Sequence, residues 1–438
     1  MRVYFLTLGC RVNQYETDAA RRLFLDNGHI NVDTPEEADV CIVNTCSVTG
    51  EADRKSFQML RRMARKNPSA VIVAMGCSSE LKTGEVPADI VIGTREKNTV
   101  VKQVEEFVAS GSKTLSHSTS HTRPEVSKTD DYHDFGTVLS PEGTRAFIKI
   151  EDGCNNFCTY CIIPYARGRV VSRPEEFCIS EAEFLVGSGF KEIVVSGIHL
   201  CSYGKDMGKD NSALLDVLRK IDALPGLERL RLGSLEPKSM TPEFIKGLKE
   251  LKHLCPHFHL SLQSGSDTVL KRMNRKYTLA EYEDRVNALR AEFPDMSLTT
   301  DIITGFPEET EAEFAETMAF AEKLKFAKIH VFPYSEREGT KAAAMPQIDM
   351  SIRKERAKRL IELSDRLSYE FAAAMKGRTA GILVEKIETK DGRAVAEGYT
   401  ANYVRTFADC GGHELTKGDI VEGIISGSDN ETCLMTLN

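Results

Sequence analysis

Short apolar runs alternate with longer amphipathic stretches in the first quarter of the chain. The apolar runs cover residues 3–8, 40–43, 71–74 and 90–92, and helical patterns follow the first two, through Leu23 and Met63. Strands that alternate with helices over short connections are typical of a parallel sheet covered on both faces. We therefore predict an α/β fold that begins with a doubly wound parallel sheet domain over residues 1–109.

The hydrophobic pattern is interrupted over residues 110–143. This segment is rich in Ser, Thr, Asp and His and poor in aliphatic residues, a composition typical of a solvated, flexible linker. Its histidines, His117, His121 and His133, lack the fixed spacing of metal ligands, so we predict no metal site there.

Strand–helix alternation resumes at Thr144. Six such units predict a partial (β/α)6 barrel over residues 144–375, ending in one amphipathic helix at 351–375. Barrels of this kind carry their chemistry at the carboxyl ends of the strands. The predicted strands are 146–150, 192–197, 228–234, 257–262, 297–304 and 328–333, and helices are predicted at 175–188, 212–223, 279–292 and 310–324.

The pattern changes again after Gly377. Five short runs rich in Val, Ile and Thr are separated by Gly and Asp, which predicts a small antiparallel β-barrel over residues 376–438. The predicted strands are 379–387, 393–399, 403–408, 420–426 and 432–437.

Composition places the chain among soluble cytoplasmic proteins. No run of about 18 apolar residues is present, so no membrane span is expected. The N-terminal strand-like run leads directly into polar residues 14–18, which is not the pattern of a signal peptide. Twelve cysteines without such a signal indicate a reducing compartment, where thiols bind metals or lie reduced in the core.

Three cysteines, Cys154, Cys158 and Cys161, form the spacing C-x-x-x-C-x-x-C directly after the first predicted barrel strand. Three thiolates so close together can bind three irons of a [4Fe–4S] cluster and leave the fourth iron open for S-adenosylmethionine. The alternative, a zinc site, usually shows a second C-x-x-C pair, and none is nearby. The spacing therefore predicts a radical S-adenosylmethionine enzyme, with these cysteines as its catalytic group.

The segment GCNNFCTYCIIPYARGRVVSRP (153–174) resembles the signature of the radical S-adenosylmethionine methylthiotransferases, which insert a sulfur and a methyl group at an unactivated C–H position. Glu308 departs from the family pattern, which has glycine there, and this changes the expected shape of that loop. Further matching motifs are TLGCRVNQYETD (7–18), NTCSVT (44–49), MGC (75–77), SLEP (234–237), HLSLQSGSDTVLKRMNRKY (259–277) and DIITGFPEET (301–310). The C-terminal barrel resembles the TRAM domain, an RNA-binding module.

A second set of cysteines, Cys10, Cys46 and Cys77, follows three different strands of the first domain. Because the carboxyl ends of parallel strands share one edge of a sheet, these residues are expected to converge. From the residues alone they are either cluster ligands or small buried hydrophobic side chains. The family resemblance implies that they hold an auxiliary [4Fe–4S] cluster that delivers sulfur. The remaining cysteines, 41, 178, 201, 255, 410 and 433, are interpreted as core or surface thiols.

Candidate contacts to S-adenosylmethionine lie at the ends of the barrel strands. Ser234, Glu236 and Gln263 either bind its ribose hydroxyls and ammonium group or cap turns, and the resemblance favours cofactor contacts. Tyr160 either stacks on the adenine or only packs. Gly197 either permits close backbone approach to the methionine moiety or serves as a turn glycine.

RNA binding must come from local charge, because the net charge is −8. Candidate patches are residues 54–66 with six bases and no acid, then Arg167, Arg169 and Arg173, then Lys271, Arg272, Arg275 and Lys276. Each is either an RNA contact or a solvated face. The C-terminal barrel has seven Lys/Arg against ten Asp/Glu, so Tyr399, Tyr403, Arg405 and Phe407 are its candidates for base stacking.

Two segments, TLGCRVNQYETD and GIHLCSYGKD (197–206), most resemble the family branch that acts on C2 of N6-threonylcarbamoyladenosine at tRNA position 37. The alternatives are the branches for isopentenyladenosine at the same site or for a ribosomal-protein aspartate, and a non-catalytic iron–sulfur RNA-binding protein. The resemblance implies as partners tRNA, a reducing donor such as flavodoxin or ferredoxin, and a sulfur donor.

Overall fold

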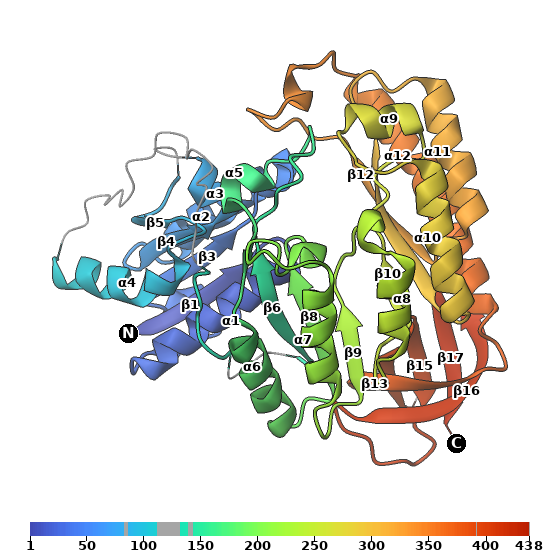
Figure 1. The fold of residues 1–438 in the computed structure, drawn as a ribbon. Helices are drawn as coiled ribbons and strands as arrows, with labels where there is room; N and C mark the ends of the chain where they lie inside the picture. Colours follow the sequence, from blue (N-terminus) through green and yellow to red (C-terminus); the bar gives the residue numbers. More distant parts are fainter. Residues whose placement is uncertain (83–85, 112–131, 139–142, 391, 438) are drawn as a thin grey trace.

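The computed structural model describes residues 1–82, 86–111, 132–138, 143–390 and 392–437. An N-terminal α/β sheet, a central set of parallel strands backed by helices, and a C-terminal barrel follow one another along the chain (Figure 1). In the described ranges, no helix combines the length and the apolar character needed to cross a bilayer.

The N-terminal sheet has five parallel strands in the order β2-β1-β3-β4-β5. Ile42 packs with Phe24 on the face of α1 and α4, whereas its neighbour Val43 packs with Leu60 on the face of α2. Helices on both faces confirm the predicted doubly wound sheet. The bounds are β1 Arg2–Thr7, α1 Arg11–Asp26, β2 Ile30–Asn31, η1 Pro35–Glu37, β3 Val40–Thr45, α2 Gly50–Lys66, β4 Val71–Gly76, α3 Cys77–Leu81, β5 Ile90–Ile92, η2 Lys97–Thr99 and α4 Val100–Ala109.

The predicted linker is described at residues 110–111, 132–138 and 143, and His117 and His121 lie outside the described residues. The described part is not fully solvated. Val138 is buried, and its backbone N–H donates to the Glu181 carboxylate at 2.8 Å. This segment, which holds both aromatic residues of the predicted linker, Tyr132 and Phe135, therefore packs against the central domain.

Six parallel strands make up the centre of the molecule. β6, β8 and β9 form one sheet with the short antiparallel β7, and β10–β12 form a second. Two isolated bridges, Leu230 with Leu254 and Leu235 with Leu260, join the two sheets. All six predicted strands are present. The bounds are β6 Arg145–Asp152, α5 Ile163–Arg167, β7 Val171–Ser172, α6 Glu175–Gly187, β8 Glu192–Gly197, η3 Leu200–Ser202, α7 Ser212–Asp222, β9 Arg229–Leu232, η4 Pro237–Ser239, α8 Pro242–Lys249, β10 His257–His259, α9 Asp267–Arg272, α10 Leu279–Glu292, β11 Ser297–Thr304, α11 Glu311–Leu324, β12 Lys328–Pro333 and η5 Ala342–Ala344.

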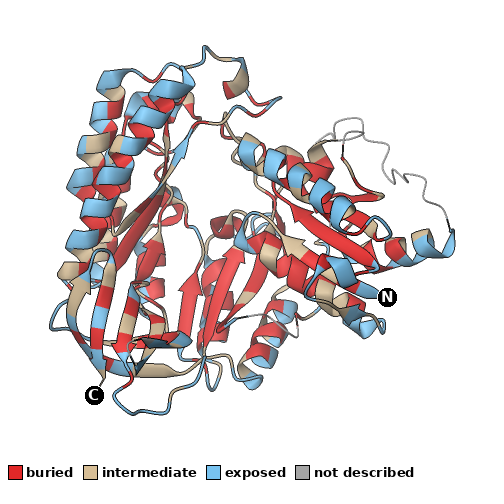
Figure 2. Ribbon diagram, turned by 180° about the vertical axis from the view of Figure 1, so that it is seen from behind, coloured by how far each residue is buried: buried red, intermediate tan, exposed pale blue. Residues whose placement is uncertain are grey.

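Helix packing fixes the outer wall of this domain. The strands and the inner sides of the helices share one continuous apolar core, while the outer sides of the helices are exposed (Figure 2). α10 and α11 each begin with a capping box, at Thr278 with Glu281 and at Thr310 with Glu313. The strand ends above this core are consequently held in place to carry side chains.

The long helix α12, Met350–Ala373, leads into a closed barrel in the order β13-β14-β15-β17-β16. Four of its pairings are antiparallel, as predicted, but β15 and β17 pair in parallel. The reason is that β16 pairs with β13 and closes the barrel. The last strand, β17, therefore lies between β15 and β16 and pairs with both. The bounds are β13 Thr379–Lys390, β14 Arg393–Thr400, β15 Arg405–Asp409, β16 Ile420–Asp429 and β17 Thr432–Leu437.

Candidate active site

The loop after β6 carries Cys154, Cys158 and Cys161. It turns at Gly153, which has φ +77°, and a Cβ there would lie 2.0 Å from the carbonyl oxygen of Arg169. Only glycine fits this turn. The Thr159 N–H donates to the carbonyl of Met273 at 3.1 Å, which anchors the loop to the end of α9.

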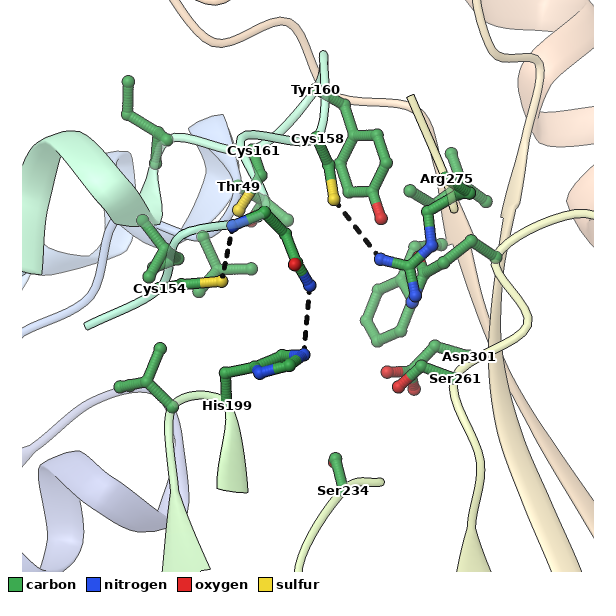
Figure 3. A pocket seen from close by; sticks show the side chains of 18 of the residues that line it. Thr49, Cys154, Cys158, Tyr160, Cys161, His199, Ser234, Ser261, Arg275 and Asp301 are labelled. Carbon is green, nitrogen blue, oxygen red and sulfur yellow. Dashed lines mark hydrogen bonds between the residues drawn. The ribbon is translucent and has the colours of Figure 1, made fainter. Parts of the chain in front are cut away.

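All three cysteines face a cavity of about 300 Å³ above the strand ends (Figure 3). The carboxyl ends of the parallel strands supply most of the remaining walls, where chemistry is expected in such folds. Val48 and Thr49, which follow Cys46 in the N-terminal domain, also line it. The cavity therefore lies where the two domains meet.

Four of the five predicted contacts to S-adenosylmethionine, Tyr160, Ser234, Glu236 and Gln263, line this cavity. The Tyr160 ring also packs edge-on against Phe306, with ring centroids 6.5 Å apart. Burial raises the pKa of Tyr160 well above its usual value, so the phenol stays neutral.

Gly197 is the fifth predicted contact, and it is absent from the walls of the cavity. A Cβ at this position would lie 2.7 Å from Oε2 of Glu151, which is fully buried. Burial raises the pKa of Glu151 well above its usual value, and its Oε2 accepts the backbone N–H of His199 at 2.7 Å. The missing side chain of Gly197 therefore makes room for Glu151.

Replacing Gly197 with alanine is expected to lower the free energy of unfolding by about 1–3 kcal/mol, the usual cost of overpacking a core. Thermal unfolding of the metal-free protein measures this. Gly187→Ala is the matched control, because its Cβ would meet no atom within 4 Å. Equal melting temperatures for the two variants would contradict the role given to Gly197.

Arg275 was a candidate either for an RNA-binding patch or for a solvated face, and the structure places it in neither. Its guanidinium is buried in the cavity and donates to Sγ of Cys158 at 3.2 Å and to both oxygens of Glu236 at 3.1 Å. Glu236 also contacts His199 Nε2 at 3.1 Å. Burial raises the pKa of Glu236, but His199 and Arg275 outweigh burial and lower it. The carboxylate thus stays charged beside the cysteines.

Arg167 and Arg173 are likewise buried, at 4% and 1% exposure, and so cannot contact RNA. Arg173 pairs with Glu181 and Asp134. Runs of basic residues in a sequence usually indicate a solvent-exposed face. These guanidinium groups instead form ion pairs with carboxylates from other segments of the chain. By contrast, the bases of α2 are exposed, as are Lys271 and Lys276, while Arg169 and Arg272 are partly exposed.

The second cysteine set converges as predicted from the strand order. Thr7 pairs with Asn44 and Thr45 with Gly76, so β1, β3 and β4 end at one level. Cys10, Cys46 and Cys77 follow these ends. A Cβ on Gly9 would lie 2.8 Å from Sγ of Cys46, which places the Cys10 loop directly against it.

Burial governs the chemistry of the thiols in both sets. It raises the pKa of Cys46 to about 11 and of Cys161 to about 12, and it raises the pKa of Cys77 and Cys154 too. Such thiols stay protonated at neutral pH unless a metal displaces the proton. Deprotonation on metal binding is what iron–sulfur ligation requires.

Each set offers three thiols, which is the donor number of a [4Fe–4S] cluster with one iron left open. In the described residues, the one set of three His, Cys, Asp or Glu ligand atoms within 4.8 Å of one another is His259, Asp301 and His330, so neither cysteine set meets that spacing. We conclude that the donor chemistry of both sets fits such a cluster.

A buried charge network lies under the second cysteine set. Glu16 accepts from Lys149 at 2.8 Å, from Arg167 at 2.8 and 3.1 Å, and from Lys97. Asp152 also pairs with Lys149 and Arg167. Three cations thus meet two carboxylates, and Arg167 and Lys97 also act on the Cys77 thiol. The surplus positive charge favours anionic sulfur at that position.

Arg337 joins the two cysteine regions across the domain boundary. Its guanidinium donates to Ser47 Oγ at 2.7 Å and to Asp53 Oδ2 at 2.5 Å. Ser78, which follows Cys77, donates to the carbonyl of Cys46 at 2.7 Å. These bonds hold the second cysteine set in register with the cavity.

Sequence reasoning did not single out His199, Asn156 or Arg337. The Asn156 backbone N–H donates to Sγ of Cys154 at 3.5 Å, and its side chain contacts His199 Nε2 at 3.0 Å. His199 lies in GIHLCSYGKD and Asn156 between the cysteines, so both fall within motifs already recognised. Arg337 has no such signal, because its partners are remote in sequence.

The chain matches two family models. One, described as "Radical SAM superfamily", matches residues 148–321. The other, described as "Uncharacterized protein family UPF0004", matches residues 2–93. The two matched segments contain all six cysteines of the two sets.

Several curated proteins resemble the chain over most of its length. A threonylcarbamoyladenosine tRNA methylthiotransferase MtaB of Bacillus subtilis is 41% identical, over 92% of this chain and 89% of that protein. The MtaB of Aquifex aeolicus is 39% identical, over 91% and 95%. A tRNA-2-methylthio-N(6)-dimethylallyladenosine synthase of a Thermoanaerobacter species is 34% identical, over 92% and 86%.

Among solved structures, the radical S-adenosylmethionine methyltransferase TsrM of Kitasatospora setae has a similar fold. The TM-score is 0.56 at 16% identity, and the match covers 89% of this chain and 79% of TsrM. At this identity the likeness concerns the fold alone.

Proposed function

The chain belongs to the radical S-adenosylmethionine methylthiotransferases, and from this membership we propose that it methylthiolates C2 of N6-threonylcarbamoyladenosine at position 37 of tRNA. Enzymes of the family use S-adenosylmethionine and [4Fe–4S] clusters. Two MtaB proteins at 41% and 39% identity support the threonylcarbamoyl substrate.

The observation that carries the proposal is that the second cysteine set lies beside the cavity of the first. The segment after Cys46 reaches the walls of the cavity that Cys154, Cys158 and Cys161 line. When bound there, the cofactors supply a 5′-deoxyadenosyl radical for hydrogen abstraction and sulfur for transfer. A non-catalytic binding protein would need neither an open iron nor two converging sites.

The residues of the chain then have separate roles. Cys154, Cys158 and Cys161 would hold the cluster that binds S-adenosylmethionine, and Cys10, Cys46 and Cys77 the auxiliary cluster. Arg275 places a buried positive charge on Cys158, and such hydrogen bonds to sulfur tune the reduction potential of a cluster. A donor such as flavodoxin or ferredoxin would supply the electron, and a separate sulfur donor would restore the transferred sulfur.

We further propose that the exposed bases of α2 contact tRNA phosphates. They are Arg54, Lys55, Arg61, Arg62, Arg65 and Lys66, of which Arg54 and Lys66 also pair with nearby acids. The C-terminal barrel is proposed to be a TRAM-like RNA-binding module. Its Tyr399 and Tyr403, however, stack on each other 4.9 Å apart, and Tyr403 stacks on His257, so their rings already pack on the central domain. Arg405 and Phe407 remain its stacking candidates.

The test of the substrate is a tRNA nucleoside profile from a strain that lacks the gene. Loss of the 2-methylthio derivative of threonylcarbamoyladenosine, with accumulation of its precursor, is the expected result. Loss of the isopentenyladenosine derivative, or of the ribosomal aspartate modification with intact tRNA, would overturn the proposal.

Replacing Cys46 with alanine is expected to block methylthiolation but not the cleavage of S-adenosylmethionine. Methylthiolated product should fall by more than about 100-fold, because even outer partners of metal ligands often cost that much. Reductive cleavage of S-adenosylmethionine should continue. Cys41→Ala is the matched control, since Cys41 lies in β3, the strand that leads to Cys46, and is buried in the apolar core. Equal product loss in both variants would argue against a ligand role for Cys46.

A further inference from the structure

A second cavity, of about 620 Å³, lies directly below the first in the space that the central strands enclose. Along β11, Ser297 and Thr299 line the lower cavity, and Asp301 and Ile303 line the upper one. Ser234 lines both. The two cavities are therefore successive levels of one interior space.

Three residues that line the lower cavity each have a buried nitrogen without a hydrogen-bond partner. Arg231, 3% exposed, uses Nε for Glu192 and Nη1 for the carbonyl of Ala401, but its Nη2 has no hydrogen-bond partner. Arg145, 7% exposed, also has an unpartnered Nη2, and His257 an unpartnered Nδ1. Buried charged groups with open donor positions are costly unless a ligand satisfies them.

The donors are held rigidly. The Arg231 guanidinium lies 4.6 Å and that of Arg145 5.2 Å from the centre of the Tyr403 ring, and His257 stacks on the same ring at 4.9 Å. Tyr403 comes from the C-terminal barrel, which closes this end of the cavity. The C-terminal barrel thus helps to orient the side chains of Arg231, Arg145 and His257.

The charge of the walls selects the sign of the ligand. Glu431 is the one acidic residue among the described lining residues, and Lys328 pairs with it at 2.6 Å. The cationic lining residues are Arg11, Arg145, Arg231, Lys328 and Arg405. The nearby set of His259, Asp301 and His330 has the composition of a metal site. The positive charge around it would repel a divalent cation. Behind the wall, the guanidiniums of Arg145, Arg229 and Arg231 share the buried Glu192, and Arg145 also pairs with Glu385. Three cations thus meet two carboxylates beside the cavity, and the remaining positive charge favours an anion.

We propose that the lower cavity binds the carboxylate of the threonylcarbamoyl group, with Arg231 and Arg145 as specificity-determining residues. This inference rests on the proposed function. In the purine ring, C2 and the N6 substituent flank N1, so a base with C2 facing the upper cavity can extend its substituent into the lower one. An isopentenyl group has no acceptor and would leave the buried donors unpaired, which is how such sites reject analogues.

The test compares two anticodon stem-loops as substrates of the reconstituted enzyme. One carries N6-threonylcarbamoyladenosine, and the other carries its carboxamide, which removes only the negative charge. The wild-type enzyme should prefer the acid by at least about 30-fold in kcat/KM, as expected when a charged hydrogen-bonded pair is lost. Arg231→Gln should reduce activity on the acid by that factor and leave activity on the amide within about threefold.

A structural role for Arg231 would instead lower activity on both substrates equally, and that result would overturn the inference. Arg229→Gln is the matched control, because Arg229 also contacts Glu192, at 3.5 Å, and the C-terminal barrel but does not line the cavity. It should keep the acid preference. Arg11→Gln, at an exposed lining residue, should weaken the preference without a folding cost.

Binding gives a second readout that does not depend on the clusters. Fluorescence anisotropy measures the affinity of the metal-free protein for each of the two labelled stem-loops. Because both stem-loops make the same phosphate contacts, the difference between the two affinities reports on the carboxylate alone. The acid should bind more tightly to wild type and equally to Arg231→Gln. A wild-type enzyme that acts only on an isopentenyladenosine stem-loop would refute the proposed substrate, and this inference with it. Activity on the acid without any acid preference would refute the inference alone.

Discussion

Cys158→Ala is expected to abolish the reductive cleavage of S-adenosylmethionine and to lower the iron content from about eight to about four per chain. Cys158 is the most buried of its three-cysteine set and receives the Arg275 hydrogen bond. Two remaining thiols cannot hold three corners of a cluster. The auxiliary cysteines lie in another domain, so their four irons should stay.

Anaerobic reconstitution with iron and sulfide, iron analysis and quantification of 5′-deoxyadenosine measure this effect. Cys178→Ala is the control, because Cys178 is buried in the same domain but belongs to its apolar core. The reciprocal variant, Cys10→Ala, should lose about four irons and keep cleavage. Iron content unchanged in both Cys158→Ala and Cys10→Ala would contradict the assignment of two clusters.

The positions of the strands and of the cysteines after them could be predicted from the sequence, because each depends on a local pattern of residues. Parallel strands buried on both faces give continuous apolar runs, such as 40–43, and the cysteines follow such runs directly. The convergence of Cys10, Cys46 and Cys77 needed only the rule that parallel strands end at one edge. Short elements such as β7 and α5 were not predicted, because a segment of two to five residues is too short to show a hydrophobic period.

Charge was the least reliable guide. Arg167, Arg173 and Arg275 look like solvated bases in sequence, yet each meets a carboxylate from another segment of the chain. Gly197 was interpreted from its place at a strand end, but its neighbour Glu151 decides its role. Tyr403 stacks on a histidine of another domain instead of lying free. Partners that are remote in sequence cannot be inferred from one chain segment.

Glu16→Gln is expected to cost about 3–5 kcal/mol in the free energy of unfolding, the usual price of leaving buried charges unpaired. Glu16 comes from α1, whereas Lys149 and Arg167 come from the central domain. The variant would leave Lys149 and Arg167 to share Asp152, and it would remove the carboxylate that pairs with Lys97. The N-terminal domain should therefore detach more readily, with faster hydrogen exchange in α1 and β6.

The control for this variant is Asp26→Asn on the same helix, which breaks only an exposed pair with Arg22 and should have no measurable effect. Denaturant unfolding of the metal-free proteins compares them.

The pH dependence follows from the pKa of Glu16. Burial raises it, but Arg167, Lys149 and Lys97 outweigh burial and hold it well below the ordinary 4.5. A carboxyl with a lowered pKa in the folded state stabilises fully above its unfolded value and loses this contribution as the pH falls toward the folded value. The gap between wild type and Glu16→Gln should therefore be constant at neutral pH and narrow below about pH 4.5. A gap that instead widened in acid would show that Glu16 is protonated in the folded protein, and the three cations would then need another counter-charge.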